Sequence, residues 1–351
     1  MPAGPTVVIT DSDLASREDE RVLREAGLTI VRLQAKTEAE VVAGLAEADP
    51  DALIVQWAPV SAAALEAAPR CRFISRLGIG YDMINVAAAT ERGVAVANTP
   101  DYCVDEVVAH TLAMALGLLR GLGRFDAAVR AGQWSAAVPY PRACRPSEAT
   151  IGVIGVGRIG ARVARQAQAL GFGVLACDPY VAAVRGEGEA AGGVPLTALE
   201  DLLRRSDLVT LHAPLTDETR HLIRTETIGL MRPGALLVNT CRGGLVDEAA
   251  LAGALRGGQL AGAALDVFET EPLPGASPLR SLPNVLLSPH AAWYSPASLA
   301  ELPVQAARQV VDFLAGRPVP AIVNPGYLTR ARPPRPRTPP DAVTPRAASP
   351  G

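Results

Sequence analysis

The chain has 351 residues, of which 49% are hydrophobic and 20% are charged. This length is enough for two domains with sizeable cores, and the composition excludes a wholly disordered or fibrous chain. Because 33 basic residues stand against 36 acidic ones, the formal net charge is −3. Such a chain has no overall positive field, and we expect neither nucleic acid nor a membrane surface as its partner.

The five cysteines form no Cys-x-x-Cys pair, so we expect no metal site and a reducing compartment. The longest apolar runs are well short of the roughly 20 residues that span a bilayer. No secretory signal opens the sequence. A cytoplasmic location is therefore expected.

Short apolar runs alternate with helical stretches along most of the chain. In the first hundred residues the predicted strands are residues 6–10, 28–33, 52–55, 72–75 and 94–96. A long amphipathic helix is predicted over residues 104–122. The predicted strands then resume at residues 151–156, 174–178, 208–211, 235–239, 261–266 and 285–287. This alternation indicates βαβ units and an α/β fold with two doubly wound parallel sheets.

The last 26 residues, 326–351, differ in composition from the rest. They contain seven prolines and five arginines but one acidic residue, and they lack apolar periodicity. We expect this segment to be a disordered tail. Its Pro-x-x-Pro pattern could bind a protein partner weakly, although a solvated tail without a partner accounts better for the composition.

A glycine-rich segment, GVGRIG at residues 155–160, follows one predicted strand and opens a predicted helix, and Asp178 ends the next strand. This combination is typical of a dinucleotide-binding site. Gly155 would allow a tight turn, Gly157 a close approach to the pyrophosphate, and Gly160 close packing of the helix. The alternative is three glycines in an ordinary turn.

Asp178 indicates which dinucleotide binds. Its carboxylate would accept hydrogen bonds from the adenosine ribose and would repel a 2′-phosphate. We therefore expect NAD as the cofactor, in preference to NADP.

Three polar residues follow predicted strands of the second sheet: Arg242, Glu271 and His290. Ligands of open α/β sheets bind at this carboxyl edge, so the three side chains could converge on one site. Arginine provides a planar, permanently charged fork for a carboxylate, and imidazole is suited to proton transfer near neutral pH. Taken singly, each could instead be a surface arginine, a loop charge or a polar strand end.

These motifs resemble the D-isomer-specific 2-hydroxyacid dehydrogenase family, from the first strand to about Asn324. Further matching segments are residues 76–82 (RLGIGYD), 98–100 (NTP), 211–216 (LHAPLT) and 231–235 (MRPGA). Residues 289–295 (PHAAWYS) also resemble the branch of the C-terminal-binding protein corepressors. The resemblance implies a flavodoxin-like substrate domain, residues 1–99 and 296–325, with an inserted Rossmann domain, residues 100–295, that binds NAD.

The resemblance also implies roles for individual residues. Arg242 would bind the carboxylate of a 2-oxo acid, and His290, oriented by Glu271, would be the general acid and base. The residues expected on the cofactor side are Gly155, Gly157, Arg158, Ile159, Gly160, Asp178, His212, Pro214, Thr240, Asp266 and His290. Those expected on the substrate side are Arg76, Gly78, Ile79, Gly80, Arg242 and Trp293.

Two alternatives to this dehydrogenase remain open. One is a scaffold that senses NAD(H) with little turnover, as the corepressor resemblance suggests. The other is a dehydrogenase of a phosphonate-like analogue, because Arg242 would accept either oxyanion. As in the family, the helix at residues 104–122 would help to form a homodimer.

Overall fold

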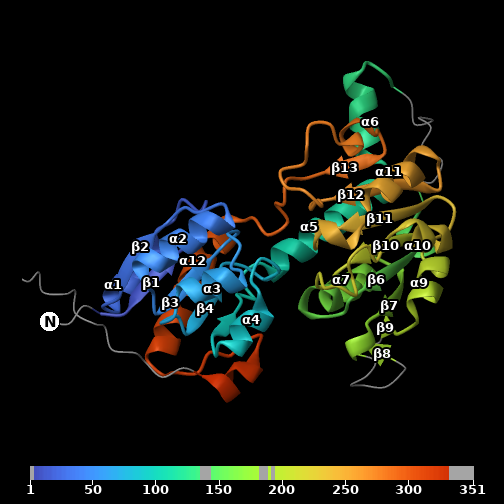
Figure 1. The fold of residues 1–351 in the computed structure, drawn as a ribbon. Coiled ribbons are helices and arrows are strands. Elements are labelled where there is room, and N and C mark those ends of the chain that lie inside the picture. The colour runs from blue at the N-terminus through green and yellow to red at the C-terminus, as the bar shows by residue number, and fades with distance from the viewer. Residues whose placement is uncertain (1–3, 135–143, 182–188, 191–193, 332–351) are drawn as a thin grey trace, which may run out of the picture. The chain divides into compact units, whose positions relative to one another are not determined.

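The computed structural model describes residues 4–134, 144–181, 189–190 and 194–331. The chain folds into two compact units, which Figure 1 shows in ribbon form. One unit comprises Met1–Tyr102 with Leu299–Gly351, and the other comprises Cys103–Ser298. The domain boundaries expected from the sequence follow residues 99 and 295. The observed units divide after residues 102 and 298, three residues further along in each case. Residues 332–351, most of the predicted tail, lie outside the described part.

A five-stranded parallel sheet with the order β2-β1-β3-β4-β5 forms the centre of the first unit. Its strands are β1 (Thr6–Ile9), β2 (Thr29–Arg32), β3 (Ala52–Val55), β4 (Phe73–Arg76) and β5 (Ala95–Ala97). Each lies within one residue of its predicted position, because short apolar runs between polar turns mark buried strands well. This strand order is that of flavodoxin-like sheets, which confirms the predicted fold class.

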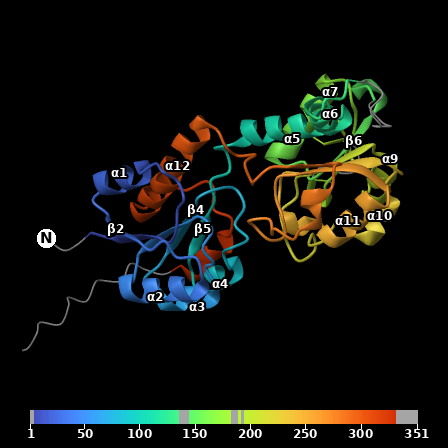
Figure 2. The ribbon, with the colours of Figure 1, turned by 90° about the horizontal axis from the view of Figure 1, so that it is seen from above.

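Helices cover both faces of this sheet. They are α1 (Glu18–Glu25), α2 (Glu38–Ala48), α3 (Ala62–Ala67), α4 (Val86–Glu91) and most of α12 (Pro296–Leu314). Figure 2 shows α1 and α12 on one face and α2, α3 and α4 on the other. The two segments of this unit meet in its core, where the ring of Phe73 on β4 stacks on Phe313 of α12, with centroids 4.5 Å apart.

The ordered part of this unit extends beyond its predicted end. Residues Pro325–Arg330 form a 3₁₀ helix, η4, although disorder is predicted from residue 326. The Tyr327 side chain is buried, with its ring centroid 6.3 Å from that of Phe313. The predicted start of the tail is therefore wrong, because one aromatic contact with a distant helix outweighs the polar local composition.

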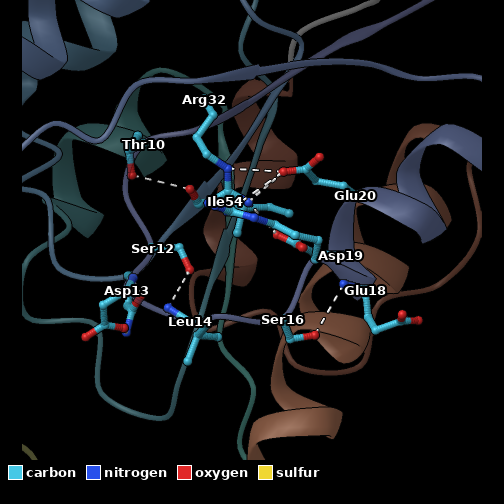
Figure 3. Close-up of polar contacts among 12 residues, drawn as sticks. Thr10, Ser12, Asp13, Leu14, Ser16, Glu18, Asp19, Glu20, Arg32 and Ile54 are labelled. Atoms are coloured by element: carbon cyan, nitrogen blue, oxygen red, sulfur yellow. Dashed lines mark hydrogen bonds and ion pairs between the residues drawn. The ribbon is translucent and has the colours of Figure 1, made fainter.

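Ion pairs link the edge strand β2 to α1. Arg32 lies 3.0 Å from Glu20 and 3.4 Å from Asp19, and Figure 3 shows the three side chains together. Burial raises the pKa of Asp19 above its ordinary value, even though Arg32 lies beside it. Nearby, the hydroxyl of Thr10 donates to the carbonyl oxygen of Ile54 at 3.3 Å, which joins the ends of β1 and β3.

The second unit contains a six-stranded parallel sheet with the order β13-β12-β11-β10-β6-β7. Its strands are β6 (Thr150–Ile154), β7 (Gly173–Cys177), β10 (Leu208–Leu211), β11 (Ala235–Asn239), β12 (Leu260–Leu265) and β13 (Val285–Leu287). All six lie within two residues of prediction. A short antiparallel pair, β8 (Glu189–Ala190) and β9 (Val194–Pro195), was not predicted. The order reverses between β6 and β10, and ligands of such sheets bind at this switch point.

Six helices of the second unit are described. They are α5 (Val104–Leu119), α6 (Leu122–Arg130), α7 (Arg158–Ala169), α9 (Leu199–Arg205), α10 (Thr225–Leu230) and α11 (Glu248–Arg256). Figure 2 shows α5 and α7 on one face of the sheet and α9, α10 and α11 on the other. The sheet is therefore doubly wound, as predicted.

The predicted helix at residues 104–122 is in fact two helices. The first, α5, ends at Leu119, and Gly121 adopts a left-handed conformation with φ of 64° before α6 begins. Ten residues of α5 are buried, where the helix packs on α7, β11 and β12. Among the described residues no single helix is long and apolar enough to cross a membrane, and α5 with α6 meets that test only as a pair bent by 63°.

Candidate active site

The glycine segment, residues 155–160, lies at the switch point of the second sheet, where it forms the turn after β6 and the first residues of α7. Gly155 has φ of +88°, and a Cβ atom on it would lie 2.5 Å from the carbonyl oxygen of His212. A Cβ atom on Gly160 would lie 1.9 Å from the carbonyl oxygen of Gly155. The packing of the loop and helix therefore requires glycine at both positions.

Gly157 differs from Gly155 and Gly160, because a Cβ atom there would meet nothing within 4 Å beyond the adjoining backbone. Packing within the protein does not explain this glycine. It leaves the backbone at the N-terminus of α7 open to close approach, which is what the phosphates of a dinucleotide need. Arg158 begins the helix with an exposed side chain, whereas Ile159 packs against the core of the unit. These residues fit an NAD pyrophosphate.

Asp178 follows β7 and is bound to the glycine loop. One carboxylate oxygen accepts the N–H of Val156 at 2.9 Å, and the other accepts the N–H groups of Tyr180 and Val181 at 3.0 and 3.1 Å. Three backbone donors thus fix the carboxylate beside the loop, at the position expected for the residue that binds the ribose.

The side chains expected near the nicotinamide follow β10, β11 and β12. His212 follows β10 and contacts the glycine loop, and its Nε2 lies 3.0 Å from the hydroxyl of Thr210. The residue as a whole keeps some exposed surface, but its ring is enclosed, and this burial lowers the pKa of His212 to about 4. The ring is therefore neutral at physiological pH. Pro214, two residues on, is exposed.

Two further residues expected on the cofactor side are buried. Thr240 is 8% exposed, and its hydroxyl lies 2.8 Å from that of Thr111 on α5. The side chain of Asp266, which follows β12, is completely buried.

Arg242 lies in a tight turn after β11. The buried side chain of Asn239 accepts the N–H of Cys241 at 3.0 Å and donates to the carbonyl oxygen of Arg242 at 2.8 Å, so it closes the turn. The Arg242 side chain is half-buried, and one guanidinium nitrogen lies 2.8 Å from the carbonyl oxygen of Cys241. Asn239 was not identified from the sequence. Its position as the last residue of a predicted strand was a signal that could have suggested it.

Glu271 and His290 form a hydrogen-bonded pair. The Oε2 atom of Glu271 lies 2.7 Å from Nδ1 of His290, and its Oε1 accepts the N–H of Phe268 at 2.9 Å. Burial alone would raise the pKa of Glu271. Hydrogen bonds from His290 and Phe268 and the positive charge of Arg242 outweigh burial and hold this pKa below its ordinary value.

This pair determines which ring nitrogen of His290 carries a proton. An ionised carboxylate only accepts hydrogen bonds, so Nδ1 of His290 carries a proton and donates it to Glu271. The structure thus brings Glu271 and His290 into contact, and it brings Arg242 close enough for its charge to act on Glu271. Trp293, three residues after His290, is half-buried and packs edge-on against Tyr294, with ring centroids 6.1 Å apart.

The remaining expected substrate residues belong to the first unit. Gly78 has φ of +138°, and its N–H donates to the hydroxyl of Thr99 at 2.7 Å. The side-chain amide of Asn98 donates to the carbonyl oxygen of Ile79 at 2.7 Å. In the part of the chain that the structure describes, the N–H groups of Ile79 and Gly80 have no hydrogen-bond acceptor.

Arg76 is 4% exposed, and its guanidinium carbon lies 5.3 Å from the ring centroid of Trp57. Trp57 follows β3 at the carboxyl edge of the first sheet and is 42% exposed. The structure therefore places Trp57, more than Arg76, at the surface of this edge. Sequence reasoning did not identify Trp57 individually, although an aromatic side chain in a loop directly after a strand was a usable signal.

Comparison with known proteins identifies the family. The family model "D-isomer specific 2-hydroxyacid dehydrogenase, NAD binding domain" matches residues 112–292. A glyoxylate reductase from Korarchaeum cryptofilum is 40% identical over 291 residues, which make up 82% of this chain and 86% of that protein. A D-3-phosphoglycerate dehydrogenase from Mycobacterium tuberculosis is 41% identical over 283 residues, which make up 79% of this chain and 52% of that protein. This chain thus spans about half the length of that relative.

Solved structures agree with this assignment. The crystal structure of a D-lactate dehydrogenase from Aquifex aeolicus, complexed with NAD and lactic acid, matches with a TM-score of 0.76 and 30% sequence identity. The match covers 88% of this chain and 96% of that chain. The chain therefore belongs to the D-isomer-specific 2-hydroxyacid dehydrogenases and is an NAD-dependent enzyme of that family.

Proposed function

We propose that this enzyme reduces a 2-oxo acid to a D-2-hydroxy acid and catalyses the reverse oxidation, with Arg242, Glu271 and His290 as the reacting set. The observation that carries the proposal is the position of Glu271, which bonds Phe268 through one oxygen and His290 through the other. This arrangement fixes the tautomer and the orientation of the imidazole.

Each of these residues has a chemical task. The Arg242 guanidinium pairs with the substrate carboxylate and polarises the adjacent 2-oxo group. Bound NADH supplies the hydride that adds to C2. As the carbonyl electron pair moves onto oxygen, His290 gives that oxygen the proton on Nε2, and in the oxidation it takes the proton back. Glu271 stays ionised and stabilises the imidazolium form.

The cofactor preference rests on Asp178. Its carboxylate is fixed beside the glycine loop by three backbone N–H groups, and its negative charge would repel a 2′-phosphate. We expect a lower KM for NADH than for NADPH. A lower KM for NADPH would contradict this part of the proposal.

The expected homodimer would use α6 more than α5. The apolar side chains of α5 are largely buried within the second unit, whereas Leu122 and Val129 on α6 are 60% and 53% exposed. Sedimentation that finds only monomer would contradict the dimer.

The experiment that tests the function is NADH oxidation by the purified protein against a panel of 2-oxo acids. The panel runs from glyoxylate through hydroxypyruvate to branched and aromatic members, with a phosphonate analogue included. Turnover that Arg242→Ala abolishes would support the dehydrogenase and rank its substrates by kcat/KM. NADH binding without turnover of any member would favour the corepressor-like scaffold. The enzyme names of the relatives support turnover.

A further inference from the structure

The buried side chain of Asp266 holds the turn that carries His290. One carboxylate oxygen, Oδ1, accepts the N–H of Ala291 at 2.8 Å, and the other, Oδ2, accepts the N–H of Ala292 at 2.9 Å. The N–H of His290 donates to the backbone carbonyl oxygen of Asp266 at 2.7 Å. Three consecutive residues are thus bonded to Asp266.

A left-handed backbone at His290 makes this support necessary. His290 has φ of 54°, which few residues other than glycine adopt without support from their surroundings. A change in the position of Asp266 would therefore move or release the backbone that orients the imidazole.

Two side chains in turn hold Asp266. The hydroxyl of Ser288 donates to Oδ1 of Asp266, and Nε2 of His110 lies 3.1 Å from the Ser288 oxygen. A serine hydroxyl has one hydrogen, which here goes to Asp266. Nε2 of His110 must therefore carry a proton and donate to Ser288. His110 therefore donates to Ser288, and Ser288 donates to Asp266.

His110 lies on α5, whose other side chains are largely buried against α7, β11 and β12. Its Nε2 lies 3.8 Å from Oδ1 of Asp266, so it also approaches this carboxylate directly. We propose that His110, on α5, is a positioning residue for the reaction. Through Ser288 it holds Asp266, and Asp266 holds the turn that carries His290.

The proposal rests on the proposed function, since it assigns His110 a part in placing His290. It does not require His110 to touch substrate or cofactor. A carboxylate has roughly four acceptor positions. The Asp266 carboxylate uses three of them to accept from Ser288, Ala291 and Ala292. One position is left, so Asp266 can take part in this network and also act on the cofactor side.

The test compares substitutions at His110. His110→Met fills a similar volume but cannot donate to Ser288, whereas His110→Gln can place an amide N–H near the position of Nε2. Ser288→Ala breaks the same chain of hydrogen bonds one link later. Ala113→Met is the matched control, because it places the same methionine at an exposed position of α5.

We expect His110→Met and Ser288→Ala to lower kcat about tenfold or more, since small displacements of a reacting group are costly. The Tm should stay near its wild-type value. His110→Gln should recover most of the kcat, and Ala113→Met should have no effect. Wild-type kcat in both His110→Met and Ser288→Ala would overturn the proposal, as would an equal loss in His110→Gln and His110→Met.

A second measurement is independent of turnover. Amide hydrogen exchange of the cofactor-free protein should be faster at Ala291 and Ala292 in His110→Met than in wild type, and unchanged in Ala113→Met. Unchanged exchange in His110→Met would also overturn the proposal. A wild-type protein that reduces no 2-oxo acid, but whose exchange responds to His110→Met, would contradict the proposed function and leave the structural link intact.

Discussion

A Cβ atom on Gly243 would lie 1.8 Å from the carbonyl carbon of Phe268 and 2.0 Å from its carbonyl oxygen. The turn after β11 therefore touches the turn after β12 backbone to backbone. Arg242 directly precedes this contact, and the N–H of Phe268 holds the Glu271 carboxylate. The close approach of these two turns brings the charge of Arg242 near Glu271.

Gly243→Ala should therefore disrupt the site. The two turns must move apart to admit a methyl group, and we expect kcat to fall about 100-fold because Arg242 and Glu271 are both displaced. The control is Gly253→Ala in α11, where a Cβ atom would meet nothing within 4 Å. Steady-state kinetics of the two variants check the prediction. Equal activity in both would show that the contact is unimportant.

The glycines of the cofactor loop should respond differently to alanine. Gly157→Ala places its methyl group where nothing lies within 4 Å beyond the adjoining backbone, so the Tm should be unchanged while the Kd for NADH rises at least about tenfold. Gly160→Ala would push against the carbonyl oxygen of Gly155 and should lower the Tm itself. Calorimetry and NADH titration separate the two effects. Unaltered NADH binding by Gly157→Ala would remove this glycine from the cofactor site.

The Glu271 pair predicts a specific pH dependence. The pKa of Glu271 lies below its ordinary value of 4.5, so its ionisation stabilises the folded state above that pH. This contribution disappears as the pH falls through the lower folded value. Glu271→Gln removes the charge, and kcat should fall about 100-fold at neutral pH because the imidazolium loses its partner.

The corresponding measurement is denaturant unfolding of wild type and Glu271→Gln between pH 7 and 3. The wild-type advantage should shrink toward the acid end of this range. A difference in unfolding free energy that does not change with pH would contradict the assigned ionisation.

The buried His212 should make the stability of the fold depend on pH as well, in a range above that of Glu271. Burial lowers the pKa of His212 to about 4, from 6.5 in the unfolded chain. Between these values the unfolded chain binds a proton that the folded protein does not, so stability falls as the pH decreases from 6.5 to 4. One pKa unit is worth about 1.4 kcal/mol, which limits the loss to about 3 kcal/mol.

His212→Gln keeps a polar group near Thr210 but cannot titrate. Its unfolding free energy should therefore decline less than that of wild type over this pH range, with the difference between the two proteins largest near pH 4. Parallel pH curves for the two proteins would show that His212 does not remain neutral in the folded state.

Sequence reasoning succeeded where the signal is local. The eleven strands of the two main sheets lie within two residues of prediction because each is a short apolar run between polar turns. Asp178, Arg242 and His290 were singled out because each lies shortly after such a run, at the edge of the sheet where ligands bind; their roles stay predictions. Gly155 and Gly160 meet the conformational and packing demands for which they were singled out.

Sequence reasoning failed where a distant contact decides the outcome. Tyr327 is buried because Phe313 lies beside it, and a composition rich in Pro and Arg gives no sign of that contact. Gly121 ends α5 inside an amphipathic pattern that continues past it. The hydrogen bond between His110 and Ser288 joins residues 178 positions apart. Periodicity within one segment cannot reveal such a pair.

The sequence by itself determined the two parallel sheets and the turns in which the glycine segment, Arg242, Glu271 and His290 lie, because apolar periodicity and turn chemistry act over a few residues. Only the tertiary structure decided that the Glu271 carboxylate bridges Phe268 and His290, that Gly243 lets two turns touch, and which helix supports the His290 turn. These relationships depend on packing between segments far apart in the chain, where a difference of a few tenths of an ångström decides whether a hydrogen bond forms.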